Sequence, residues 1–133
     1  MTEPVIYIDR SRVRPGKFDD LRRAIHNLVE FIDAREPQLL HYGFYFDEKS
    51  ARMTVIAVHP NPVSVELHME IGTPAFRDFG DLIEMEGIEI YGKPSDRMLE
   101  QLEQKVEMLG EHGRVIVDQL DAGFTRIGAT STS

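Results

Sequence analysis

Two runs rich in β-branched and aromatic residues, 39–46 and 52–59, dominate the hydrophobic pattern of the chain. They flank a short polar segment, 47–51, and this arrangement is typical of a β-hairpin. Both runs are apolar on both faces, not only on alternate residues. A hairpin of this kind belongs in the middle of a sheet that is covered on both sides.

Before the hairpin, the pattern predicts a strand and then a helix. In the strand, residues 5–12, Ile6 and Ile8 point to one face while Val5, Tyr7 and Asp9 point to the other. A proline–glycine turn over 14–17 leads into a helix over 17–35. The apolar stripe of that helix, at helical spacing, comprises Phe18, Leu21, Ile25, Leu28, Val29 and Ile32.

After the hairpin, the pattern predicts two short helices and a fourth strand. A helix over 63–71 is broken by Gly72, and a new helix begins with Thr73 as its N-cap and Pro74 as its first residue. The strand covers 88–92, and the pattern leaves open whether 84–87 belong to it or to the preceding loop.

The last third of the chain is predicted to add a helix and a strand. Ser95 is the expected cap of a helix that ends at Gly110. A fifth strand covers 114–120, and 123–127 are a candidate extension of the sheet.

This order of elements predicts an α+β fold. Two interleaved βαβ units with right-handed crossovers give a ferredoxin-like antiparallel sheet of four strands with helices on one face. The core covers 5–92, and a helix–strand extension covers 94–127, so that 1–127 form a single domain. The small, polar residues 128–133 are expected to form a disordered tail.

Helices on one face leave the other face of the sheet open. Apolar residues expected there are Tyr42, Phe44 and Phe46, or Val55 and Ala57. A patch of that size favours a homodimer in which two sheets pack face to face. The extension would then clasp the partner or cover a sheet edge; in the competing arrangement it covers the open face of its own chain.

Composition restricts the partners. The chain has 133 residues and a net charge of −8, which argues against nucleic acid or an anionic membrane as a partner. It has no cysteine, and no apolar run is long enough to span a bilayer. The acidic N-terminus lacks the features of a signal peptide, so a cytoplasmic protein is expected.

Several motifs over residues 5–91 resemble a known family. They are the strand Ile6-Tyr-Ile-Asp-Arg-Ser, the turn Pro15-Gly16-Lys17, the hairpin, and a helix that bears His68 ahead of Thr73-Pro74-Ala75-Phe76-Arg-Asp-Phe79. This pattern is similar to the dimeric α/β-barrel superfamily, in particular its antibiotic-biosynthesis-monooxygenase-like branch.

The resemblance implies a small protein that binds a flat aromatic or quinone-like molecule between sheet and helices. His68 matches a histidine that commonly precedes a Thr/Ser-Pro-x-Phe segment in that family. Haem degradation is not expected, because Asp9 and Gly80 stand where the haem-degrading members have asparagine and histidine, and the chain has no tryptophan.

His68 is the candidate catalytic residue, since a neutral imidazole can take a proton from a phenol or hydroquinone. The alternative is a half-buried histidine bonded to the backbone. Candidate substrate-binding residues are Asp9, Tyr45, His59, Phe76 and Phe79. A carboxylate such as Asp9 in an apolar strand must be paired, hydrogen-bonded or shifted in pKa. No metal site and no cofactor are expected, because no histidines or cysteines show ligand spacing.

Three functions remain open. The first is a cofactor-independent monooxygenase-like enzyme for a small aromatic or quinol. The second is a non-catalytic homodimer that binds a small hydrophobic ligand or a protein partner, and the third is an effector-binding regulatory module. An open cavity beside His68 would favour the first, and a solid core there would remove it.

Overall fold

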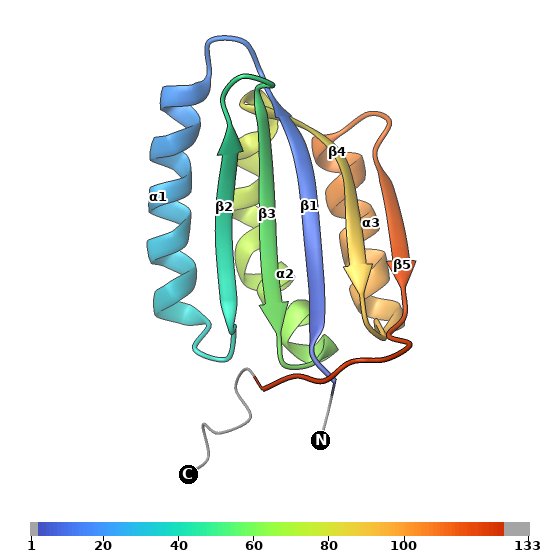
Figure 1. The fold of residues 1–133 in the computed structure, drawn as a ribbon. Helices are drawn as coiled ribbons and strands as arrows, with labels where there is room; N and C mark the ends of the chain where they lie inside the picture. The colour runs from blue at the N-terminus through green and yellow to red at the C-terminus, as the bar shows by residue number, and fades with distance from the viewer. Residues whose placement is uncertain (1–2, 127–133) are drawn as a thin grey trace.

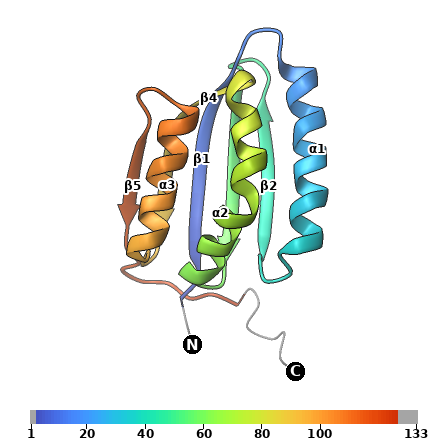
Figure 2. The ribbon, with the colours of Figure 1, turned by 180° about the vertical axis from the view of Figure 1, so that it is seen from behind.

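Five strands form one mixed sheet, and three α-helices lie on one of its faces (Figures 1 and 2). This computed structural model describes residues 3–126. The elements are β1 (Val5–Val13), α1 (Phe18–Arg35), β2 (His41–Asp47), β3 (Arg52–His59), α2 (Pro62–Arg77), a 3-10 turn η1 (Asp78–Asp81), β4 (Ile83–Tyr91), α3 (Asp96–Leu109) and β5 (Arg114–Asp118). The strand order β2-β3-β1-β4-β5, with the first four antiparallel, confirms the ferredoxin-like prediction.

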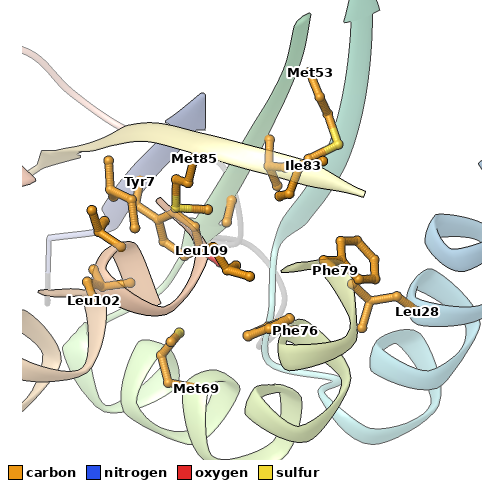
Figure 3. Packing of buried hydrophobic residues seen from close by; sticks show 14 of the residues in the cluster. Tyr7, Leu28, Met53, Met69, Phe76, Phe79, Ile83, Met85, Leu102 and Leu109 are labelled. Carbon is orange, nitrogen blue, oxygen red and sulfur yellow. The ribbon is translucent and has the colours of Figure 1, made fainter. Parts of the chain in front are cut away.

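β1 is the central strand, and its alternation decides what faces the helices. Val5, Tyr7 and Asp9 are buried on the helix-covered face, as the period of two predicts. Tyr7 lies opposite Ala57 of β3 and Ile90 of β4, so these residues share one face. They belong to the core between the sheet and the helices, part of which Figure 3 shows from close by.

α2 is one continuous helix, and the prediction of two helices separated at Gly72 was wrong. Gly72 is buried against the ring of Phe76, which occupies the space that a side chain would need. Pro74 removes only one backbone donor from the helix, and the Thr73 hydroxyl donates to the carbonyl of Met69 in the same turn. Packing therefore outweighs two local helix-breaking signals.

β4 is longer than the predicted strand of residues 88–92, because it includes residues 84–87, which the pattern could not assign to strand or loop. The register between β1 and β4 shifts at Arg10 and Ser11, opposite which β4 has one extra residue, Glu86. β5 is shorter than predicted and pairs parallel to β4. Residues 123–126 do not form a strand, and residue 127 and the tail 128–133 lie outside the described residues.

The extension packs against the same chain. α3 covers β4 on the helix side, and β5 adds to the edge of β4, so the extension covers an edge of the sheet (Figure 2). The Ser95 hydroxyl accepts the backbone N–H of Met98 and caps α3, as predicted. The competing arrangement, in which the extension covers the open face, is not seen for the described residues.

The open face carries different residues from those expected. Tyr42, Phe44 and Phe46 pair with Ala57, Val55 and Met53, and both sets face the helices. Ile6 and Ile8 of β1 and Ile56 and Val58 of β3 point to the open face, and all four are half-buried. Within residues 3–126, no helix is long and apolar enough to cross a membrane.

Candidate functional site

A group of buried titratable side chains lies between the sheet and the helices. Tyr7 and Asp9 come from β1, His59 from the end of β3, His68 from α2 and Lys105 from α3. Each is no more than 5% exposed. Buried charged and polar groups are costly unless they are paired, so this group requires an explanation beyond packing.

His68 is held by a carboxylate from the end of α1. Its Nδ1 lies 2.9 Å from the carboxylate oxygens of Glu36, and the side chains of both residues are fully buried. Burial raises the pKa of Glu36 to about 7. Burial and the charge of Lys105 lower the pKa of His68 to about 3, so its imidazole is neutral at physiological pH.

His59 is held by the start of α2. Its Nδ1 lies 2.7 Å from the Ser64 hydroxyl, and the Ser64 backbone N–H donates to the N-cap residue Asn61. Burial, together with the nearby His68 and Lys105, lowers the pKa of His59 to about 3. The second imidazole is therefore also neutral, and the helix cap fixes its position.

Aromatic rings surround His68. Its ring centroid lies 5.0 Å from Tyr42, 5.4 Å from Phe76, 5.3 Å from His59 and 6.1 Å from Tyr7. Burial raises the pKa of both tyrosines well above the usual value, so their hydroxyls remain protonated. The walls around His68 are therefore flat, mostly apolar and able to donate hydrogen bonds.

Asp9 forms a buried ion pair with Lys105. The Lys105 ammonium lies 3.1 Å from one carboxylate oxygen of Asp9, and the two residues are 96 positions apart. Burial raises the pKa of Asp9, while the charge and hydrogen bond of Lys105 act in the opposite direction. The sequence required a partner for Asp9 from another element, and α3 supplies it.

Four polar atoms of this group have no hydrogen-bond partner among residues 3–126. They are the Tyr7 hydroxyl oxygen, Asp9 Oδ1, His59 Nε2 and His68 Nε2. Buried polar atoms in folded proteins are normally satisfied by protein or by ordered water. The atoms therefore offer donors and acceptors to a water or a ligand at the centre of the group.

The space beside this group is small, and neither His59 nor His68 lines it. It has a volume of about 20 Å³ and is lined by Asp9, Tyr42, Phe44, Phe76, Phe79 and Lys105, with aliphatic and methionine side chains completing the wall. It has room for about one water molecule. Several of the side chains that bound it, including Phe76, Phe79, Met53 and Met85, are seen in Figure 3. A larger ligand could enter only if these side chains moved.

The structure brings five of the six sequence-predicted site residues to this region. Asp9, Phe76 and Phe79 line the cavity, and His59 and His68 lie in the adjoining polar group. Tyr45 does not join them: it lies on the open face, is 47% exposed, and its hydroxyl is 2.9 Å from His41 Nε2. Residues 3–126 contain no group of three side chains placed to bind a metal.

The sequence analysis did not identify three residues of the site, which are Glu36, Tyr42 and Lys105. Lys105 interrupts the apolar stripe formed by Met98, Leu102 and Leu109. A lysine on that stripe was a visible signal of a buried cation. Glu36 places a carboxylate at the C-terminal end of α1, where the helix dipole disfavours negative charge.

Comparison with solved structures identifies proteins of the same fold. MupZ from Pseudomonas fluorescens matches 94% of this chain and 96% of its own, with a TM-score of 0.70 and 14% sequence identity. SnoaB from Streptomyces nogalater, described as a cofactor-independent oxygenase, matches 71% of this chain and 96% of its own, with a TM-score of 0.57 and 15% identity.

A putative antibiotic biosynthesis monooxygenase from Caulobacter crescentus matches 67% of this chain and 88% of its own, with a TM-score of 0.61 and 16% identity. No protein-family profile and no curated protein sequence matches the chain. The chain therefore shares its fold with these proteins, which include a putative antibiotic biosynthesis monooxygenase and a cofactor-independent oxygenase, and this is the fold that its motifs predict.

Proposed function

We propose that the chain is a cofactor-independent monooxygenase-like protein that binds a small aromatic or quinol molecule between sheet and helices. The observation that carries this proposal is the His68–Glu36 pair inside an aromatic enclosure. Nδ1 of His68 is occupied by Glu36, while Nε2 has no partner in the described part of the chain. SnoaB, a cofactor-independent oxygenase of the same fold, supports the reaction class.

The protonation state of Glu36 decides what Nε2 can do. When Glu36 carries its proton, it donates to Nδ1, and the neutral imidazole keeps its hydrogen on Nε2. When Glu36 is ionised, Nδ1–H donates to the carboxylate, and Nε2 presents a lone pair. Because the pKa of Glu36 is raised to about 7, the base form becomes the major one above neutral pH.

The proposed chemistry begins with transfer of a phenolic proton to His68 Nε2. The resulting phenolate can give electrons to O₂, which is the co-reactant. For a 1,4-hydroquinone the balanced reaction is hydroquinone plus O₂ to hydroxyquinone plus water. One oxygen atom enters the ring, the other leaves as water, and the substrate supplies all the electrons. To lie beside His68, the flat ring would displace part of the packing around it, and Tyr42 and Phe76 would then flank the ring.

The test is oxygen uptake with 1,4-dihydroxynaphthalene, corrected for oxidation without protein. His68→Ala is expected to lower the protein-dependent rate by about a hundredfold or more, because it removes the general base. His26→Ala is the matched control, since His26 is exposed on α1, and it should keep the wild-type rate. Equal rates for wild type and His68→Ala would refute the role of His68.

A second function is favoured by the small size of the cavity. A space of about 20 Å³ that His68 does not line cannot admit a bicyclic ring without rearrangement. The alternative is therefore a non-catalytic homodimer that binds a small hydrophobic ligand or a protein partner. Absence of protein-dependent oxygen uptake with every hydroquinone tested would favour this alternative.

Both functions include a homodimer that forms through the open face of the sheet. Four half-buried aliphatic residues, Ile6, Ile8, Ile56 and Val58, occupy that face, and Ile116 of β5, separated from Ile8 by Glu89 of β4, is 50% exposed. A second copy of the same face would cover them.

Ile56→Glu is expected to convert the dimer into a monomer, because it places a carboxylate in the centre of this face. Sedimentation velocity of wild type and variant measures the change. Asn27→Glu on the exposed side of α1 is the control and should remain dimeric. A wild-type monomer at micromolar concentration would contradict the proposed interface.

A further inference from the structure

Lys105 is a buried cation that belongs to the extension and reaches the candidate site. It is 5% exposed, and its ammonium lies 3.1 Å from Asp9. It also lies 4.3 Å from the ring centroid of Phe76 and 5.5 Å from that of Tyr7. The same two rings contact His68, so the cation and the candidate base lie on the same aromatic enclosure.

A groove between α2 and α3 leads from the surface to this lysine. Its volume is about 320 Å³, and its lining residues are Met69, Glu70, Thr73, Arg77, Arg97, Glu100, Gln101, Gln104, Lys105 and Met108. Lys105 lines both this groove and the small inner cavity. A volume of this size is in the range of small-molecule sites, whereas the inner cavity alone is far below it.

Among the described residues, the Lys105 ammonium forms an ion pair with one carboxylate, that of Asp9. Asp9 contributes one oxygen to the pair, and its other oxygen has no partner among the described residues. His59 and His68 are neutral, because burial and, to a smaller extent, the charge of Lys105 lower their pKa to about 3. An ammonium in a low-dielectric enclosure attracts an anionic oxygen strongly.

We propose that Lys105 receives the ionised oxygen of an aromatic ligand, which enters through the groove between α2 and α3. This inference rests on the proposed binding of an aromatic molecule, and it names the ligand class as an ionisable phenol or hydroxyquinone. Lys105 would hold the oxyanion while His68, across the ring of Phe76, faces another part of the same ligand. The extension thus contributes a binding residue that the ferredoxin-like core of 5–92 lacks.

Two variants and two ligands test the charge recognition. Asp9→Asn and Asp9→Asn/Lys105→Met differ only in the lysine, and neither leaves a buried carboxylate unpaired. The probes are 2-hydroxy-1,4-naphthoquinone, which is ionised at neutral pH, and its methyl ether, which is not. The double variant should bind the ionised quinone at least about tenfold more weakly in equilibrium dialysis, with the ether within about twofold.

The outcomes separate recognition from a structural role. Equal weakening for both quinones would overturn the proposal, because the lysine would then act only on the fold. The proposal would also be overturned if the double variant kept the affinity of Asp9→Asn for the ionised quinone. It would be overturned as well if the ionised quinone did not bind Asp9→Asn. If the Asp9→Asn background does not fold, Lys105→Met is compared with the exposed Lys93→Met, and the difference between the two quinones then separates recognition from the loss of the Asp9 partner.

The path through the groove has its own test, because the chain contains no tryptophan. Gln104→Trp places a single fluorophore at an exposed position on the groove, and Asn27→Trp places one on α1. The ionised quinone should quench the first much more strongly than the second. Equal quenching would overturn the groove as the entrance. All these measurements record binding without turnover, so an inactive protein that passes them would refute only the proposed catalysis.

Discussion

Gly110→Ala is expected to lower the free energy of unfolding by about 3 kcal/mol or more. Gly110 follows α3, and a Cβ at this position would overlap the carbonyl oxygen of Met85 in β4. Its backbone angles, φ −152° and ψ 134°, are accessible to alanine, so the whole cost comes from this overlap. Because the obstacle is backbone in the middle of the sheet, it cannot move aside as a side chain would.

The expected result is detachment of α3 and β5 from β4, measured by urea unfolding and by amide hydrogen exchange of β4 and β5. Gly80→Ala is the matched control, since a Cβ there would have no heavy atom within 4 Å. It should change the unfolding free energy by less than about 0.5 kcal/mol. A Gly110→Ala variant as stable as Gly80→Ala would show that the close approach of α3 to β4 is not required.

The fold was predictable because its signals are local and agree with one another. The apolar stripe in the sequence of α1 includes all four residues that are buried in this helix, Leu21, Ile25, Leu28 and Ile32. The alternation in β1 placed Tyr7 and Asp9 on one face. Such periodicities depend only on helix and strand geometry, which tertiary contacts rarely override in long elements.

Local signals failed where tertiary packing decided the result. Gly72 and Pro74 both read as helix breakers, yet α2 passes through them because Phe76 packs on Gly72. Alternation in β2 and β3 separated the side chains into two sets but could not say which set meets the helices. For that reason Tyr45 was predicted at the site in place of Tyr42. In a strand, a shift of one residue moves every side chain to the other face of the sheet.

The chemistry of the site was the least predictable part, because its pairs join distant positions. Glu36 and His68 are 32 residues apart, and Asp9 and Lys105 are 96 apart. A single sequence shows which residues are out of place, such as a lysine on the apolar stripe of α3. It does not show which of them meet, since that depends on how α1, α2 and α3 cross the sheet.

The stability of the protein is expected to rise by about 3 kcal/mol between pH 4.5 and pH 6.5. In the unfolded chain both histidines bind protons below pH 6.5, whereas His59 and His68 in the folded protein have a pKa of about 3. Each lowered histidine pKa therefore contributes stability that is lost as the pH falls. Glu36 opposes them, because its folded pKa of about 7 favours the folded state at low pH and loses that contribution as the pH rises toward 7.

Between pH 4.5 and 6.5 the unfolded chain binds on average about one more proton than the folded protein, or about 1.4 kcal/mol per pH unit, and stability should level off near pH 7. Glu36→Gln removes the opposing group, so urea unfolding should show about twice that slope before the same plateau. Asp9, whose pKa is also raised, is present in both proteins and does not affect the comparison. Glu30→Gln on α1 should keep the wild-type profile, and an unchanged slope in Glu36→Gln would mean that Glu36 is already ionised in the folded protein at pH 4.5.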